Sequence, residues 1–398
     1  MMENLQQLVL RLHSLVLFHG LLEDPVVQKF MILAQTAEQG DPEKCVAAYS
    51  DFCAQLFTRG TNFSDYLLQA VLESENLYIL KKARGAKTGA TLEKCLKNEL
   101  AVLQELAGIQ SAQLKRLIPY DGFLPDWDSS GHNFLQIYKE RIAHIGTYGY
   151  GLFSKYHFFT VSGGELAPVK HPDETRLSAL SGYEYERGCV VKNTLALLEG
   201  KPAANVLLYG DSGTGKSSTV KAVVNEFAQR GLRLIEIRKN QLRMIPALID
   251  TLGKNPLKFI LFIDDLSFTR DDDDFGALKA ILEGSVSART KNLAVYATSN
   301  RRHLVRETFS EREGDEVHAN DTIQQLTSLS DRFGLTITFS RPNREQYFTI
   351  IDHLSELYGV KMDSGDLHRQ AEIYALERGG RSPRVAKQFL EQVQSIGI

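Results

Sequence analysis

The chain has 398 residues, a length that suits two or three domains. Its 43% hydrophobic and 24% charged residues are ordinary for a globular protein and supply ample apolar material for a core. The formal net charge of −3 gives no global electrostatic reason to expect nucleic acid as a partner, although a local basic patch could still exist.

The cysteines and the apolar segments bear on the cellular compartment. None of the cysteines has C-x-x-C spacing, so we expect free thiols and neither a metal site nor a disulfide framework. The first twenty residues lack a basic region and a small-residue cleavage site, and no run of about 18 apolar residues occurs. We therefore expect a cytoplasmic protein with no membrane partner. The cysteines are Cys45, Cys53, Cys95 and Cys189.

The first 120 residues predict a mostly helical N-terminal domain, because their apolar residues recur at helical spacing. Asp24-Pro25 and Asp41-Pro42 have the form of an N-cap followed by a proline at the first helical position. Two long helices are expected further on, one over 65–83, capped by Ser64, and one over 91–117. This domain could be a bundle that packs on itself, or it could present a surface to a macromolecular partner that the sequence does not identify.

The amino-acid composition changes after residue 120. Residues 121–175 are rich in glycine and aromatics and predict a connector with a β-hairpin around Ser162-Gly163-Gly164. Residues 176–342 then alternate strand-like and helical stretches, which predicts a parallel sheet with helices on both faces. The pattern of residues 343–398 is typical of helices alone, which predicts a small helical lid. The strands are expected at 205–209, 232–237, 259–263, 293–298 and 335–339.

The segment 205–217 carries the strongest chemical signal. A predicted strand is followed by Gly-Asp-Ser-Gly-Thr-Gly-Lys-Ser, which matches the phosphate-binding pattern G-x-x-x-x-G-K-[ST] before a predicted helix. The glycines let backbone N–H groups surround phosphate oxygens at a helix N-terminus. The lysine adds charge for the β- and γ-phosphates, and the serine hydroxyl joins the shell of a Mg²⁺ ion. The candidate nucleotide-binding residues are Gly210, Asp211, Ser212, Gly213, Thr214, Gly215, Lys216, Ser217 and Ser218.

Two later strands end in polar residues, which should meet the phosphate loop at one edge of a parallel sheet. Asp264 follows the apolar run 259–263 and is the expected ligand of Mg²⁺, together with Ser217. Asp265 is the candidate for polarising the attacking water. Asn300 follows another strand and could hold that water against the γ-phosphate, although an ordinary turn residue would look the same.

These elements, in this order, resemble the AAA+ superfamily of P-loop ATPases over roughly 176–398. The resemblance implies ATP and Mg²⁺ as cofactors and an α/β fold, in which a parallel sheet sandwiched by helices precedes a helical lid. The AAA+ core would then occupy 176–342 and the lid 343–398. In finer wording, LSGYEYERGCVVKNTLALLEG, NVLLYGDSGTGKSS and LSDRFGLTITF are similar to a bacterial AAA+ family known only as domain of unknown function 815.

The resemblance also implies roles for two arginines. The segment 329–334 is similar to the arginine-finger segment of the superfamily, which implies that Arg332 reaches the γ-phosphate held by a neighbouring protomer. The chain would then form a homo-oligomer, such as a hexamer. Residues 380–386 are similar to the second sensor of the lid, which implies that Arg384 points at the phosphates. Arg332 could instead form a local ion pair, and Arg384 could be a surface residue of the lid, with Arg381 as the alternative sensor.

Two further expectations concern the base and the attacking water. In the similar proteins the stretch before the phosphate loop borders the adenine, so Gly182, Tyr183 and Glu184 are candidates for the base pocket. Asp265 stands where the superfamily usually has glutamate, and its shorter side chain places the carboxylate further from the water. Since initiator and helicase-loader branches also carry Asp-Asp here, this departure implies slow turnover.

Several other segments invite functional interpretation. The four carboxylates Asp271–Asp274 are expected to be a solvated loop, because adjacent carboxylates repel and metal loops space their ligands. Phe268 and Phe275 flank them, where AAA+ remodelling proteins place the loop that grips substrate. Residues 301–303 could contact DNA but are expected to form a surface turn, and 306–321 reads as a charged surface loop.

The favoured function is a Mg²⁺-dependent ATPase that couples ATP binding and hydrolysis at a subunit interface to a conformational change in a macromolecular partner. The alternative is a slow nucleotide-gated switch or loader that presents its N-terminal helices to a partner. DNA is one such partner, although the sequence offers no support for it. A small-molecule kinase has no use for an arginine-finger segment, and no N-K-x-D follows the phosphate loop to indicate a GTPase.

Overall fold

A computed structural model of the chain separates into two compact units, Met1–Lys155 and Tyr156–Ile398. The unit boundary lies inside 121–175: the helices of this stretch belong to the first unit, and its hairpin joins the main sheet of the second. The predicted domain limits stay predictions. The structure describes residues 2–267, 276, 278–279, 281–282, 291–300 and 332–396. Outside these ranges lie Phe268, Phe275, Asp271–Asp274, 301–303 and 306–321.

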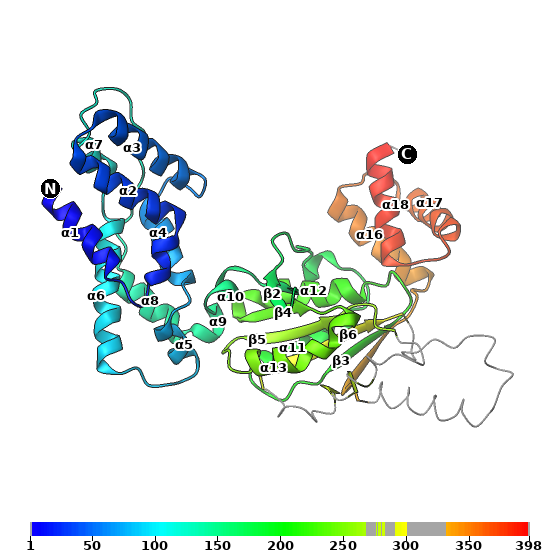
Figure 1. Cartoon of the computed structure of the whole chain (residues 1–398). Coiled ribbons are helices and arrows are strands. Elements are labelled where there is room, and N and C mark those ends of the chain that lie inside the picture. The colour runs from blue at the N-terminus through cyan, green and yellow to red at the C-terminus, as the bar shows by residue number, and fades with distance from the viewer. Residues whose placement is uncertain are drawn as a thin grey trace. The chain divides into compact units, whose positions relative to one another are not determined.

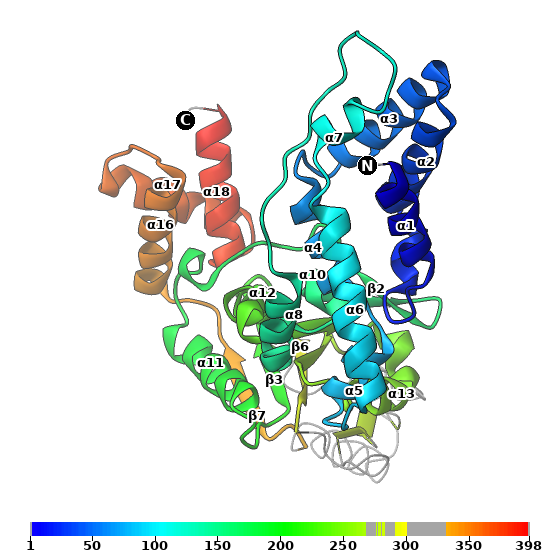
Figure 2. The same cartoon turned by 90° about the vertical axis from the view of Figure 1, so that its left-hand side faces the viewer.

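The first unit is a helical bundle around one hydrophobic core (Figures 1 and 2). The longer helices turn an apolar stripe inward, as with the buried Leu96, Leu100 and Leu103 of α6. The predicted caps Asp24 and Asp41 are confirmed, since each carboxylate accepts hydrogen bonds from the N–H groups two and three residues on. The helices are α1 (Met2–His13), η1 (His19–Glu23), α2 (Pro25–Gln39), α3 (Pro42–Phe57), α4 (Phe63–Glu73), α5 (Leu77–Ala83), α6 (Ala90–Ala107), α7 (Ser111–Lys115), α8 (Phe134–Ala143), α9 (Ile145–Tyr148) and α10 (Leu152–Lys155).

Two helices that the sequence pattern joins are broken in the structure. The helix predicted over 65–83 divides into α4 and α5, because Asn76 starts a new helix by accepting a hydrogen bond from the Ile79 N–H at 3.0 Å. The helix predicted over 91–117 divides into α6 and α7, with Gly108 directly after the end of α6. Apolar spacing continues across both breaks, so the pattern alone does not reveal them.

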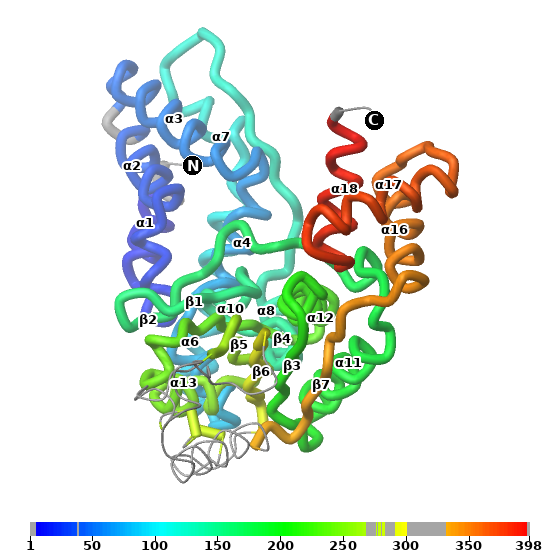
Figure 3. Tube along the Cα trace, turned by 90° about the vertical axis from the view of Figure 1, so that its right-hand side faces the viewer, coloured from blue at the N-terminus to red at the C-terminus, as the bar shows by residue number. Residues whose placement is uncertain are grey.

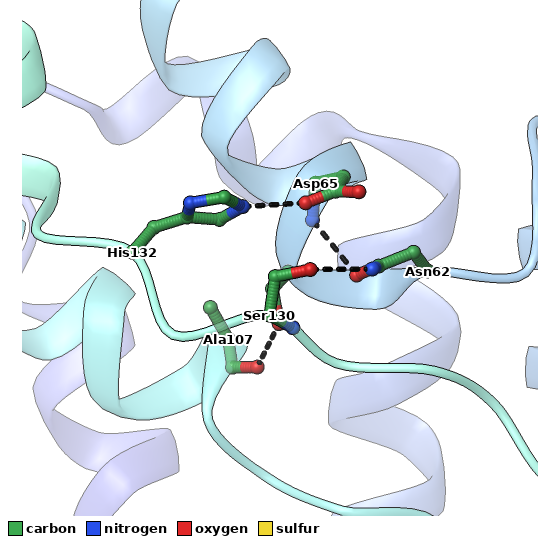
Figure 4. Close-up of polar contacts among 6 residues, drawn as sticks. Asn62, Asp65, Ala107, Ser130 and His132 are labelled. Atoms are coloured by element: carbon green, nitrogen blue, oxygen red, sulfur yellow. Dashed lines mark hydrogen bonds and ion pairs between the residues drawn. The ribbon is translucent and has the colours of Figure 1, made fainter.

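The loop before α8 is fastened to the start of α4 by a set of polar contacts (Figure 4). The predicted cap Ser64 is wrong: Asn62 accepts the hydrogen bond from the Asp65 N–H at 3.1 Å. Ser64 lies inside the helix, fully buried, and its hydroxyl donates to the Ala107 carbonyl at 2.9 Å. His132 Nε2 lies 2.5 Å from Asp65 Oδ1. These contacts give the cluster a structural role in holding the loop.

The second unit is built on a seven-stranded sheet of order β2-β1-β4-β5-β6-β3-β7, parallel except for the predicted hairpin β1-β2. Its helices α11 and α12 pack in one hydrophobic cluster with the sheet, and Figures 2 and 3 show α13 on the opposite side. The α/β fold and all five predicted strands, β3 to β7, are confirmed. The strands are β1 (Phe158–Ser162), β2 (Glu165–Pro168), β3 (Val206–Gly210), β4 (Leu232–Glu236), β5 (Lys258–Ile263), β6 (Leu293–Ser299) and β7 (Leu335–Phe339). The helices are η2 (Leu177–Ala179), α11 (Glu184–Leu198), α12 (Lys216–Phe227), η3 (Ala228–Arg230), η4 (Lys239–Met244) and α13 (Ile245–Leu252).

Parallel pairing brings the carboxyl ends of the central strands together. In the register of β3, β6 and β5, Tyr209 lies opposite Ser299 and Ile263 lies opposite Ala297. The residues that follow these three strands therefore meet at one edge of the sheet.

Three helices complete the second unit: α16 (Arg344–Tyr358), α17 (Ser364–Glu377) and α18 (Pro383–Ile396). They share a hydrophobic core of their own and form what we call the lid (Figure 3). The predicted start of α18 is confirmed, since Ser382 Oγ accepts a hydrogen bond from the Val385 N–H at 3.2 Å. Within the described ranges, no helix is long and apolar enough to cross a membrane.

Candidate functional site

The phosphate-loop motif connects β3 to α12 through a turn that requires glycine. Gly210 has φ 137°, and a Cβ there would lie 2.1 Å from the Phe339 carbonyl oxygen of β7. Gly213 has φ 79°, and a Cβ there would lie 3.0 Å from Ser382 Oγ of the lid. The loop is therefore packed between a strand and the lid, which fixes its shape on both sides.

A cavity of about 670 Å³ lies between this loop, the sheet edge and the lid, a size typical of small-molecule sites. Its wall carries four basic side chains and two carboxylates, so the balance of charge favours a bound anion. The basic residues are Arg187, Lys216, Arg384 and Lys387, and the acidic ones are Asp264 and Asp265.

The predicted nucleotide-binding residues divide into two groups. Every residue of 212–218 lines the cavity, whereas Gly210 and Asp211 do not. The Asp211 carboxylate turns instead toward the start of the lid, where Oδ2 accepts a hydrogen bond from the Arg341 N–H at 3.0 Å.

Lys216 is 6% exposed, and its ammonium group is fully engaged. Nζ donates hydrogen bonds to the carbonyl oxygens of Gly210 at 2.9 Å and Asp211 at 2.7 Å, and to Asn300 Oδ1 at 3.0 Å. Burial lowers the pKa of Lys216, and the surrounding carboxylates, Asp264 among them, oppose this shift. Because all three N–H groups are used, a phosphate must replace at least one of these bonds to reach Nζ.

Asp264 is held beside the phosphate loop by three donors to one oxygen. Ser217 Oγ and Thr298 Oγ1 each donate to Oδ1 at 2.5 Å, and the Asp265 N–H donates to it at 3.2 Å. Carboxylate and hydroxyl oxygens are ligands that Mg²⁺ takes in nucleotide sites. The pair Ser217 and Asp264 therefore fits this ion by chemical type and by position.

Asp265 has a left-handed backbone, with φ 51°, which is costly for a residue with a side chain. The conformation is held from two sides. The Asp265 N–H donates to Thr298 Oγ1 at 2.9 Å, and Oδ1 accepts from Asn300 Nδ2 at 2.8 Å. Since Asn300 also accepts from Lys216, a continuous chain of hydrogen bonds joins the phosphate loop to the acidic pair.

Tyr183 also lines the cavity, from its position at the N-terminus of α11. Its ring stacks on Phe339 with centroids 5.1 Å apart, and its hydroxyl donates to the Ser340 carbonyl at 2.6 Å. Burial raises the pKa of the Tyr183 hydroxyl. The other base-pocket candidates, Gly182 and Glu184, do not line the cavity. Apolar residues complete this end of the wall: Leu180, Ile350, Leu354 and Leu357.

Arg384, and not the alternative Arg381, meets the phosphate loop. The Arg384 N–H donates to the Gly213 carbonyl at 3.1 Å, and its Nη1 donates to Ser212 Oγ at 3.4 Å. Arg381 instead forms an ion pair with Glu372 of α17, with Nε 2.9 Å from Oε2, and this contact lowers the pKa of the Glu372 carboxyl.

Arg332 lies at the far end of β7 from the cavity. It precedes the first residue of that strand by three positions, whereas the loop meets the strand's last residue, Phe339. The five residues of β7 span about 16 Å at about 3.3 Å each. Arg332 does not line the cavity of its own chain, and 329–331, the first part of its segment, lies outside the described residues.

The structure also adds residues to the site that sequence reasoning did not assign. Thr298 forms hydrogen bonds with both Asp264 and Asp265. Its hydroxyl at the end of a buried strand is a feature of the sequence that could have identified it. Arg187 lines the cavity with its side chain 13% exposed, and burial lowers its pKa while Glu184 opposes the shift. Lys387 lies one turn after Arg384 on α18. The last two have no local sequence signal.

Comparisons with known proteins give one family and one set of similar structures. A family model described as "Protein of unknown function (DUF815)" matches residues 154–396, which is more than half of the chain. The chain is similar to a Thermotoga maritima RuvB structure titled "Holliday junction branch migration motor", at 17% identity and a TM-score of 0.38, over 55% of this chain and 64% of that one. A point mutant of the same protein matches at 18% identity and a TM-score of 0.39, over 56% and 65%. The matches therefore span just under two thirds of the RuvB chains. No curated protein matches.

Proposed function

The chain belongs to the DUF815 family, described as proteins of unknown function, and we propose that it is a Mg²⁺-dependent AAA+ ATPase acting on a macromolecular partner. The observation that carries the proposal is the hydrogen-bonded chain from Lys216 through Asn300 to Asp265, at the wall of one cavity. Such a chain joins a phosphate-binding cation to a carboxylate that can orient water, which is what hydrolysis of a bound nucleotide requires.

In the proposed reaction, the side chains position the attacking water and stabilise the charge of the phosphates. Lys216 binds the β- and γ-phosphates, and Arg384 approaches them from the lid. Asp265 and Asn300 orient the attacking water, with Asp265 accepting its proton. Mg²⁺, held by Ser217 and Asp264, would neutralise phosphate charge when bound. Tyr183 and the apolar residues beside it would accommodate the base.

We propose that the site is completed by a second copy of the chain. Arg332 is the candidate arginine finger, and its place at the far end of β7 from its own cavity supports a role in a neighbour's site. An arginine finger is worth roughly 10³–10⁵ in rate. The chain would then be a homo-oligomer that couples hydrolysis at the subunit interface to a conformational change.

A nucleotide-gated switch is the second candidate. It is favoured by the short side chain of Asp265, whose Oδ1 already accepts a hydrogen bond from Asn300 and is therefore held back from the water. A switch would bind ATP tightly and hydrolyse it rarely.

The test is steady-state ATP hydrolysis measured against protein concentration, with Lys216→Ala as the blank. The proposal expects turnover per protomer to rise with concentration and to vanish in Lys216→Ala. Bound nucleotide with negligible turnover at every concentration would favour the switch. If the chain neither binds nor hydrolyses ATP, the proposed nucleotide site is wrong.

A further inference from the structure

At one end of the first unit, α5 leads into α6 (Figure 2). Basic residues are concentrated in this stretch of the chain. Five basic residues of 81–97 form no ion pair with any residue that the structure describes. Four of the five are exposed, and Lys81 is half-buried. The five residues, which we call the α5–α6 cationic surface, are Lys81, Arg84, Lys87, Lys94 and Lys97.

The charge of the first unit is strongly segregated. Residues 81–97 hold six basic residues and one acidic residue, whereas the rest of 1–155 holds nine basic and 16 acidic residues. Elsewhere in the unit many of the basic side chains are neutralised by ion pairs. These pairs are Arg11–Glu105, Lys29–Asp51, Lys44–Asp41, Lys115–Asp126 and Lys155–Glu73.

The single acidic residue of this stretch, Glu93, is used to hold the surface together. Its Oε1 accepts hydrogen bonds from the Tyr78 hydroxyl at 2.9 Å and the Thr88 hydroxyl at 2.5 Å, and it lies 3.6 Å from Lys82 Nζ. The hydrogen bonds from Thr88 and Tyr78 lower the pKa of the Glu93 carboxyl, so it stays ionised. Glu93 thereby ties both α5 and the intervening loop to the first turn of α6, and neutralises only Lys82.

Lys94 and Lys97 lie on the same side of α6 as Glu93. At about 100° per residue, Glu93, Lys97 and Lys94 fall within an arc of about 100°. The inward face of the helix is formed by Leu96 and Leu103, which are buried and lie about 100° or more from both lysines. The cations of the loop and of α6 are therefore held around one helix end.

The chemistry of this surface indicates its partner. No large apolar side chain is exposed within 81–97, although protein interfaces, membrane surfaces and single-stranded nucleic acids are bound largely through such side chains. Apart from the exposed Leu77, one helical turn before Lys81, charge is left to provide the affinity, which suits a dense row of phosphates. We propose that the α5–α6 cationic surface binds the phosphate backbone of duplex nucleic acid, without reading its sequence.

The test measures binding of the full chain to a fluorescein-labelled 24-base-pair DNA duplex by anisotropy, between 50 and 200 mM KCl and without nucleotide. We expect the logarithm of the association constant to fall linearly with the logarithm of salt concentration. Each phosphate contact contributes about 0.9 to that slope, so Lys94→Ala/Lys97→Ala should reduce its magnitude by about 2. The same double variant should bind at least about tenfold more weakly at 100 mM KCl.

The matched control is Arg116→Ala/Lys139→Ala, which removes two exposed basic side chains of the same unit that also form no ion pair with a described residue. It should leave both slope and affinity unchanged. The proposal is overturned if the wild-type chain shows no salt-dependent binding, or if the control weakens binding as much as the α6 variant. It is also overturned if vesicles containing anionic lipid are bound and the duplex is not. Because no nucleotide is present, the result does not depend on ATP hydrolysis.

Discussion

At the scale of single residues, the acidic pair depends on Thr298. This side chain is 2% exposed, and its hydroxyl donates to Asp264 Oδ1 while accepting from the Asp265 N–H. The Thr298 hydroxyl therefore orients the carboxylate of Asp264, which is proposed to hold Mg²⁺. It also stabilises the left-handed backbone of Asp265, which is proposed to orient water. Small displacements of such groups are costly, since a shift of about 1 Å can reduce a rate about 100-fold.

We predict that Thr298→Val lowers ATP turnover by about 10- to 100-fold, because the isosteric methyl group cannot hold the acidic pair. Nucleotide affinity should change less than about threefold, since the phosphate loop itself is untouched. The free energy of unfolding should fall by about 1 kcal/mol, because the hydrogen bonds of the Thr298 hydroxyl to Asp264 and from the Asp265 N–H are lost. Turnover at saturating ATP and urea unfolding followed by far-UV circular dichroism measure the two effects.

The control for this prediction is Thr298→Ser, which keeps the hydroxyl. It should retain most of the turnover. If valine and serine reduce turnover equally, the hydroxyl is not what positions the acidic pair, and the loss comes from packing.

At the scale of elements, the phosphate loop is bonded to the lid at two points. Asp211 accepts from the N–H of Arg341, and the Arg341 guanidinium reaches onward to the Gly379 carbonyl at 3.0 Å. The contact is close, since a Cβ on Gly380 would lie 2.5 Å from Arg341 Nη1. The second point is Arg384, whose N–H donates to the loop. A change in the loop is thus transmitted directly to the turn that precedes α18.

We predict that Arg341→Gln loosens the lid. The lost hydrogen bond is exposed and worth about 1 kcal/mol, so nucleotide affinity should fall about three- to tenfold. Chymotryptic cleavage within the lid should become faster in the presence of nucleotide. Chymotrypsin is chosen because the substitution does not alter its sites.

Arg369→Gln serves as the control, since Arg369 is an exposed lid residue paired only with its helical neighbour Asp366. It should change neither affinity nor cleavage. If Arg341→Gln behaves like this control, the lid is held by Arg384 and by apolar packing alone.

At the scale of the whole molecule, the proposed site needs two chains. Lys216 lies in the cavity, whereas Arg332 lies beyond the opposite end of β7. Substitutions at the two positions should therefore complement each other only in a mixed oligomer.

We predict that Lys216→Ala and Arg332→Ala are each inactive alone and regain activity when mixed. At equal amounts and random assembly, about a quarter of the sites pair an intact lysine with an intact arginine from the neighbour. Steady-state ATP turnover of the mixture, after subunit exchange, measures this. A chain carrying both substitutions should restore nothing when mixed with either. No recovery at any ratio, with exchange verified, would argue that Arg332 does not act in a neighbouring site.

The sequence by itself determined the phosphate loop, the acidic pair, the five parallel strands and the helices of the lid. Each of these depends on residues adjacent in the chain: glycines at the positions that need positive φ, and apolar runs where a strand is buried on both faces. It also identified Asn300, because a polar residue after a buried strand can only lie at the carboxyl edge of the sheet.

Only the tertiary structure decided the choice between Arg381 and Arg384, the role of Thr298, and the turn of Asp211 away from the cavity toward the lid. Each of these follows from a contact between segments distant in sequence, such as Asp211 with Arg341, so no local pattern encodes it. The breaks between α4 and α5 and between α6 and α7 belong here as well. Their apolar spacing fits one long helix, and the course of the chain is set by caps and by packing against the rest of the bundle.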